Sequence, residues 1–132
     1  MGNELTITEQ KNMVSVLTAN PLGNIIKPLT HEIHLFDSYV AGTTHVKDES
    51  VFDSLQKDDK LILKREPDNK FDENAILVLN EKEEKLGYIP EKDNVVFARL
   101  MDAGKYLTAT VRYNDPSGIF PRISIAIYLV DF

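Results

Sequence analysis

The sequence predicts a mainly β domain of the α+β class, with six short strands, one or two helices and a helical arm at the N-terminus. Strand-like apolar runs dominate from Glu32 onward, and turn signals separate them at short intervals. One segment of this part has a clear helical pattern instead. Because closing such a sheet hides its edges, we expect a small barrel or a strongly curved sheet. We place the arm at residues 1–30 and the β domain at residues 31–132.

The N-terminal arm carries its own helix signal. Thr6 and Glu9 have the spacing of a capping box, in which a hydroxyl and a carboxylate three residues on satisfy the first backbone donors of a helix. Apolar residues then recur at helical intervals up to Leu17. We therefore expect a short amphipathic helix from Ile7 to about Thr18, which packs on the β domain or on a neighbouring subunit.

Six segments of the β domain carry the strand signal. They are Ile33–Val40, Lys60–Arg65, Ala75–Leu79, Lys85–Ile89, Lys105–Tyr113 and Ile123–Val130. The third is almost wholly apolar, as expected of a strand covered on both faces. A charged turn joins it to the fourth, which predicts a hairpin. A single helical turn is expected at Val51–Leu55.

The clearest helix of the β domain begins after Pro90. An apolar stripe at helical spacing follows, made of Val96, Phe97, Leu100 and Met101. Gly104 stands where a helix commonly ends in a left-handed residue. The helix is therefore expected to end just before this glycine.

Charge and composition limit the function classes. The chain has 15 Lys and Arg against 21 Asp and Glu, a net charge of −6, which opposes contact with phosphates or anionic lipid. Nucleic-acid binding would then need a local basic groove, or a ligand read by stacking and hydrogen bonds. Without cysteine, disulfides and thiolate metal sites are excluded. No apolar stretch is long enough to span a bilayer, and we expect a cytoplasmic protein.

Signatures of catalysis and metal binding are weak. The P-loop, dinucleotide, nucleophile-elbow and zinc-protease motifs are absent. An S-x-x-K match at Ser54–Lys57 lacks its partner motifs. His31 and His34 are three apart in an extended segment, so they point to opposite faces. We expect no catalytic residue, no metal and no cofactor.

The polar stretch Arg65–Asn74 is the most unusual part of the sequence, because acidic and amide residues surround one aromatic between two strong strands. In one interpretation it is architectural: Asp and Asn satisfy loop backbone groups, and Phe71 plugs a barrel end. Dense oxygen donors also suggest a calcium loop, although the EF-hand register is missing. In the third interpretation it is a recognition site, where a ring stacks on a planar ligand and a carboxylate accepts a hydroxyl hydrogen.

Three blocks in order resemble the HIRAN domain family. They are Tyr39–Gly42, Leu63–Val78 and Lys85–Pro90, which match V-x-G, R-[ED]-P-x-N-x-[YF]-D-x-N-A-[IV] and G-[YH]-[IL]. The resemblance covers about residues 32–113. It implies an OB-like modified β-barrel that carries helices. Members in helicase-like DNA-repair proteins bind single-stranded DNA at its 3′ end, with the terminal nucleotide in a pocket.

The resemblance assigns roles to individual positions. Asp72 matches the acidic residue that accepts the terminal 3′-hydroxyl, and Phe71 matches the stacking aromatic beside it. Asn69 keeps the loop pattern, as does Asn74, and Tyr88 occupies an aromatic or imidazole position of the last block.

Two segments depart from the family pattern. Where DNA-binding members carry a basic residue and two aromatics, this chain has Thr43-Thr44-His45. A phosphate-binding lysine at the start of the helix is replaced by Glu91, with Lys92 adjacent.

These observations predict a non-catalytic module that binds single-stranded nucleic acid, through stacking and hydrogen bonds at Phe71 and Asp72. The full predicted site is Phe71, Asp72, Asn69, Tyr88, His45, Lys64, Arg65, Lys70 and Lys92, with the four basic side chains as phosphate contacts. The alternative is an interaction module that binds a protein or small ligand in the same pocket, which the acidic surface favours. An enzyme is the third hypothesis, and no nucleophile or base arrangement supports it.

Overall fold

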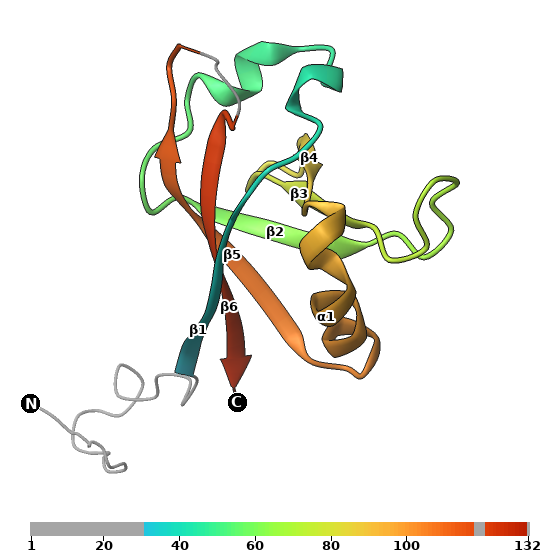
Figure 1. The fold of residues 1–132 in the computed structure, drawn as a ribbon. Coiled ribbons are helices and arrows are strands. Elements are labelled where there is room, and N and C mark those ends of the chain that lie inside the picture. The colour runs from blue at the N-terminus through green and yellow to red at the C-terminus, as the bar shows by residue number, and fades with distance from the viewer. Residues whose placement is uncertain (1–30, 118–120, 132) are drawn as a thin grey trace, which may run out of the picture. The chain divides into compact units, whose positions relative to one another are not determined.

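Six antiparallel strands form one curved sheet in the computed structural model, which describes residues 31–117 and 121–131 (Figure 1). The strands are β1 (His31–Tyr39), β2 (Lys60–Arg65), β3 (Ile76–Leu79), β4 (Lys85–Tyr88), β5 (Tyr106–Asn114) and β6 (Ile123–Asp131). The order across the sheet is β1-β6-β5-β2-β3-β4. This confirms the predicted fold class and all six predicted strands, whose ends differ by no more than two residues.

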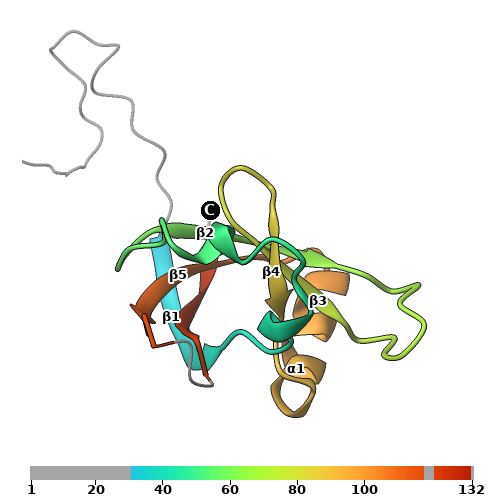
Figure 2. The ribbon, with the colours of Figure 1, turned by 90° about the horizontal axis from the view of Figure 1, so that it is seen from above.

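A β-bridge joins the two ends of the sheet. Just past β1, the Ala41 N–H donates to the Tyr88 carbonyl at 2.7 Å, and the Tyr88 N–H donates back at 2.9 Å. Viewed from above, the strands surround the interior (Figure 2). The bridge also explains the glycine at position 87, because a Cβ there would lie 2.2 Å from the Ala41 carbonyl oxygen.

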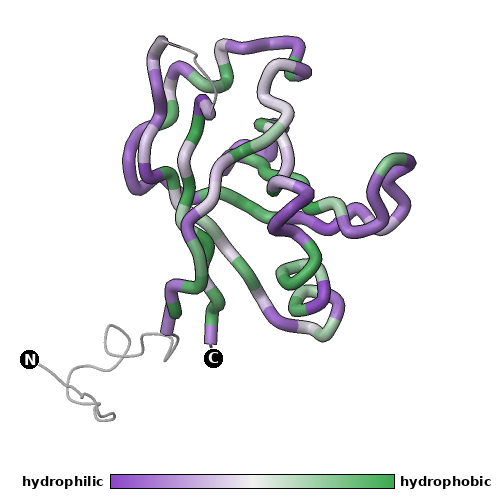
Figure 3. The backbone as a smooth tube through the Cα atoms, in the orientation of Figure 1, coloured by the Kyte–Doolittle hydropathy of each residue, from purple (hydrophilic) through white to green (hydrophobic). Residues whose placement is uncertain are grey.

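The core lies inside this sheet. Alternate residues of β5, namely Leu107, Ala109 and Val111, are buried and form its inward face. Other fully buried large side chains are Val40, Phe52, Leu61, Ile76, Val78, Leu86, Ile123, Ile125 and Ile127. Fully burying each aliphatic side chain contributes roughly 1.5–3 kcal/mol. Hydrophobic segments accordingly follow the strands, whereas the connection between β2 and β3 is mostly hydrophilic (Figure 3).

The helix α1 (Glu91–Asp102) begins after Pro90, as predicted, and its end has a defined geometry. The Lys105 N–H donates to the Leu100 carbonyl and the Gly104 N–H to the Met101 carbonyl, both at 3.0 Å. This pair of bonds is a Schellman motif, and Gly104 takes a positive φ of 91° within it. The predicted left-handed glycine cap is confirmed.

The buried face of α1 differs from the predicted stripe. Val96 is 64% exposed, so the prediction is wrong at this position. Asn94, Phe97 and Ala98 are buried instead, and Leu100 and Met101 are half-buried. The face is set by contact with the barrel, where Phe36 of β1 meets the Phe97 ring at 5.8 Å between centroids. The spacing of apolar residues in the sequence cannot show which face of the helix will be turned toward the barrel.

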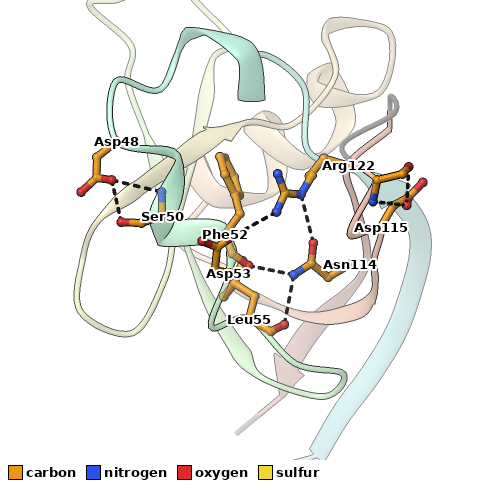
Figure 4. Close-up of polar contacts among 9 residues, drawn as sticks. Asp48, Ser50, Phe52, Asp53, Leu55, Asn114, Asp115 and Arg122 are labelled. Carbon is orange, nitrogen blue, oxygen red and sulfur yellow. Dashed lines mark hydrogen bonds and ion pairs between the residues drawn. The ribbon is translucent and has the colours of Figure 1, made fainter.

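Two short 3-10 helices, η2 (Thr43–His45) and η3 (Glu49–Phe52), follow β1 where one turn at Val51–Leu55 was expected. A polar cluster, here called the Asn114 corner, ties η3 to the end of β5 and to Arg122, the residue before β6 (Figure 4). It consists of Phe52, Asp53, Leu55, Asn114 and Arg122. The Asn114 Nδ2 donates to the carbonyls of Phe52 at 2.8 Å and Leu55 at 3.1 Å. The Arg122 guanidinium lies 5.1 Å from the Phe52 ring centroid.

The predicted helix Ile7–Thr18 and the rest of the arm lie outside the described residues. Among the helices of residues 31–117 and 121–131, none is long and apolar enough to cross a membrane.

Candidate functional site

The connection between β2 and β3, residues 66–75, projects from the barrel and is pinned at its base (Figure 1). The Glu66 N–H donates to the Ala75 carbonyl at 3.0 Å. The Arg65 guanidinium donates to the same carbonyl at 2.8 Å and to the Glu73 carbonyl at 3.1 Å. It also bonds the carboxylate of Asp102 at the end of α1, with Nε 2.9 Å from Oδ1. This bond lowers the pKa of Asp102 and raises that of Arg65.

Asn69 shapes the tip of this β2–β3 loop. Its Oδ1 accepts from the backbone N–H groups of Phe71 at 2.8 Å and Asp72 at 3.1 Å, while its Nδ2 donates to Glu66 Oε1 at 3.1 Å. Such side-chain-to-backbone bonds are why asparagine favours turns. The turn leaves the Phe71 side chain 93% exposed. The interpretation in which Phe71 plugs a barrel end is therefore wrong.

Asp72 is half-buried beside this ring, and both its oxygens are held. Oδ1 accepts from the Asn74 N–H at 2.8 Å, and Oδ2 accepts from the Asn94 Nδ2 of α1 at 2.7 Å. An ionised carboxylate offers roughly four lone-pair sites, so about two remain for a further donor. The carboxylate is thus oriented without being saturated.

Tyr88 closes another wall through its contact with Glu66. The Tyr88 hydroxyl donates to Glu66 Oε1 at 2.8 Å. The pKa of Glu66 is lowered, first by the Asn69 hydrogen bond and also by that of Tyr88, against the opposing effect of burial. Burial raises the pKa of Tyr88, and the bond to Glu66 adds to the rise. Because its hydrogen is used internally, Tyr88 contributes mainly its ring to the site.

These groups surround a cavity of about 250 Å³. It is lined by Ala41, Gly42, Asn69, Phe71, Asp72, Ala75, Tyr88, Ile89, Glu91 and Asn94. Four of the nine predicted site residues are therefore brought together here: Asn69, Phe71, Asp72 and Tyr88. Ligand pockets commonly measure roughly 300–1,000 Å³, so this cavity suits one small terminal group better than a run of bases.

The other five predicted residues do not line the cavity. His45 and Lys70 are exposed, in η2 and in the β2–β3 loop, and Lys64 is exposed on β2. Lys92 is exposed on the first turn of α1, where its Nζ lies 3.3 Å from Asp93. Arg65 is engaged at the loop base as described above, so it acts on the site through the loop.

Sequence reasoning missed Asn94, which is buried in the wall of the cavity. A signal for it exists, because Asn94 lies in helical register with Phe97, Ala98 and Met101. A polar residue in phase with an apolar face indicates a buried hydrogen-bonding group. Its partner Asp72 is 22 residues away in the sequence, which no local pattern shows.

The described residues contain no group of three or more His, Cys, Asp or Glu side chains placed to hold a metal ion. His34 instead bonds Asp37 of its own strand, with Nε2 2.7 Å from Oδ1.

Comparison with known protein families and solved structures shows what the chain is similar to. The model of the HIRAN domain family matches residues 33–130. A crystal structure of a Lactobacillus plantarum protein is 28% identical with a TM-score of 0.72, covering 78% of this chain and 99% of that one. The crystal structure of the human HLTF HIRAN domain is 18% identical with a TM-score of 0.60, covering 77% and 79%.

A solution structure of the HLTF HIRAN domain in its DNA-bound conformation is 19% identical with a TM-score of 0.49, covering 74% of this chain and 75% of that one. No curated protein sequence matches the chain.

Proposed function

Because the chain belongs to the HIRAN domain family, we propose that it is a non-catalytic module that binds single-stranded nucleic acid and holds the 3′ end of the strand in the cavity beside Phe71. The HLTF HIRAN domain has a DNA-bound conformation, so DNA binding occurs in this family. The fold alone does not carry a function, and the proposal depends on the groups gathered at the cavity.

One observation carries the proposal: a fully presented aromatic ring stands next to an oriented carboxylate at the mouth of a small cavity. The Phe71 side chain is 93% exposed, and both residues line the cavity. A base that stacks on such a ring gains roughly 1–3 kcal/mol, whatever its identity. The free acceptor sites of Asp72 suit a hydroxyl donor. A terminal nucleoside offers both features, a planar base and a 3′-hydroxyl.

The charges at the cavity favour a strand end that carries an uncharged hydroxyl over one that carries a phosphate. Two acidic residues, Asp72 and Glu91, line it, and no Lys or Arg is among the described lining residues. A phosphate placed there would be repelled, whereas a 3′-hydroxyl would not. The proposed site therefore distinguishes a 3′-hydroxyl end from a 3′-phosphate end.

Phosphates further along the strand would meet two lysines and the ring of His45 outside the cavity. Lys70 belongs to the β2–β3 loop, Lys92 follows the lining residue Glu91, and His45 ends the 3-10 helix after the lining residue Gly42. With so few cations and a net charge of −6, we expect modest affinity and a shallow salt dependence.

Fluorescence anisotropy with short labelled oligonucleotides tests the proposal. The protein should bind a 3′-hydroxyl end more tightly than the same strand with a 3′-phosphate. Asp72→Asn should weaken binding. The lost negative charge would by itself favour a negatively charged strand, so a weaker binding would have to come from the lost carboxylate acceptor. The variant keeps the Oδ1 acceptor for Asn74, so the loop is preserved.

Asp68→Asn is the matched control, because Asp68 is an exposed acid of the same loop that does not line the cavity. Equal loss in both variants, or equal affinity for both strand ends, contradicts end recognition. We also expect Asp72→Ala to weaken binding more than Lys92→Ala.

A second candidate is a module that binds a protein or a small ligand through the same cavity. The acidic surface and the lack of lining cations favour it. A stoichiometric protein partner recovered after nuclease treatment and lost in Phe71→Ala would support this candidate, provided that oligonucleotides fail to bind.

A further inference from the structure

Asn94 combines burial with an incomplete set of hydrogen bonds. It lies in the second turn of α1, its side chain is 1% exposed, and it forms part of the cavity wall. Its Nδ2 donates to Asp72 Oδ2 at 2.7 Å, while its Oδ1 has no hydrogen-bond partner. Within residues 31–117 and 121–131, no other buried side-chain nitrogen or oxygen lacks a partner.

The orientation of this amide follows from its neighbour. Only the NH₂ group can face the acceptor oxygens of a carboxylate, so Asp72 forces Oδ1 to point away from it. An unpaired buried acceptor costs free energy of folding. A leucine of similar size would avoid this cost and would suit the apolar register of Phe97 and Ala98. The Asn94 amide therefore lowers the stability of the fold through its unpaired Oδ1, while its Nδ2 holds the Asp72 carboxylate.

We propose that Asn94 is a positioning residue, which holds the Asp72 carboxylate in the direction needed to accept a hydroxyl hydrogen from the end of a bound strand. The role deepens the function proposed above and rests on it. With Oδ1 held by the Asn74 N–H and Oδ2 by Asn94, the carboxylate has one orientation relative to the cavity. Without Asn94, only the bond within the loop remains, and the free lone pairs no longer point in a single direction.

The test compares Asn94→Leu with Asn114→Leu. Each variant removes one asparagine whose side chain bonds other parts of the fold, and Asn114 belongs to the Asn114 corner and does not line the cavity. Affinity is measured for oligonucleotides that end in a 3′-hydroxyl or in a 3′-deoxy terminus. The wild type should prefer the hydroxyl by roughly 10- to 150-fold, the contribution of a hydrogen bond to a charged group.

In Asn94→Leu the two affinities should become equal, whereas Asn114→Leu should keep the preference even though it is less stable. If Asn94→Leu does not fold, Asn94→Ala takes its place. A wild-type preference that survives in the Asn94 variant overturns the proposal.

Hydrogen exchange provides a second readout that needs no ligand. The Asn74 N–H is bonded to Asp72 Oδ1, so it should exchange faster in Asn94→Leu once the exchange rates are corrected for global stability. The Asn69 N–H, bonded to the Glu66 carbonyl in the same loop, should be unchanged. Unchanged exchange at Asn74 overturns the positioning role by itself. A wild type that binds both ends equally would instead refute the proposed end recognition, and the exchange data would still decide whether Asn94 holds Asp72.

Discussion

The Asn114 corner and the β2–β3 loop each contain an asparagine that bonds backbone groups next to a phenylalanine. In the corner, Asn114 donates to carbonyls, and the Phe52 side chain is only 1% exposed (Figure 4). In the loop, Asn69 accepts from N–H groups, and the Phe71 side chain is 93% exposed. Similar polar chemistry thus produces a closed corner in one place and a presented ring in the other.

The two phenylalanine rings differ in how much stability each gains from burial. Phe52 is covered by the core and by the Arg122 guanidinium, so its burial stabilises the fold. Phe71 gains almost no burial, although several hydrogen bonds hold its loop in one shape. Its exposed ring is therefore available to contact a ligand.

Replacing Phe52 or Phe71 with alanine should give the largest difference in stability between the two regions. Phe52→Ala should lower the free energy of unfolding by about 3–5 kcal/mol, because it removes a large core side chain. Phe71→Ala should change it by less than about 0.5 kcal/mol, as is usual for exposed positions. Urea denaturation followed by circular dichroism measures both. Comparable losses would mean that Phe71 packs in solution.

Leucine at the two asparagines should show a smaller contrast. Asn114→Leu leaves the carbonyls of Phe52 and Leu55 without this donor and should cost about 1–3 kcal/mol of unfolding free energy. Asn69→Leu should cost less, since water can reach the exposed Phe71 N–H that it frees. The same denaturation experiment decides. A larger loss at Asn69 would show that the loop supports the fold.

Affinity for a strand should depend on the ring in the β2–β3 loop, although that ring should matter least for stability. Phe71→Ala should weaken binding of a single-stranded oligonucleotide by about 1–3 kcal/mol, or roughly 5- to 150-fold, for the loss of one stacked base. Tyr113→Ala, which removes an exposed aromatic on β5 away from the cavity, should leave the affinity unchanged. Anisotropy titrations at fixed salt compare them, and equal losses would indicate nonspecific contact.

The smallest expected effect is the pH dependence of the Glu66–Tyr88 pair. The pKa of Glu66 is lowered from 4.5, so its bonds stabilise the fold above that pH and are lost as pH falls through the lowered value. The pKa of Tyr88 is raised from 10.0, so the stabilisation is present below that pH and is lost as pH rises through the raised value.

The difference in unfolding free energy between the wild type and Glu66→Gln should be complete at neutral pH and should shrink in acid. Solvent screening keeps it small, because both groups are only half-buried. A difference that stays constant into acid would contradict the role of the Glu66 carboxylate.

Much of the fold was predictable because its signals are local. Strand runs, turn residues and the glycine after α1 each depend on neighbours in the chain, and they predicted the elements with small errors at the ends. The family motifs also predicted four of the ten residues that line the cavity, three in the loop and Tyr88 in the last block. The failure at Val96 has a physical cause: the buried face of a helix depends on its contact partner, which lies elsewhere in the sequence.

The amino-acid sequence by itself determined the six strands, the helix after Pro90 and a polar loop that carries Phe71 and Asp72. These follow from periodicity, capping and side-chain-to-backbone bonds, which act over a few residues. Only the tertiary structure decided that Ala41 meets Tyr88, that Arg65 pins the loop to Asp102, and that Asn94 reaches Asp72. Those contacts join residues far apart in the chain, and they form only when burial of a shared core brings the elements together.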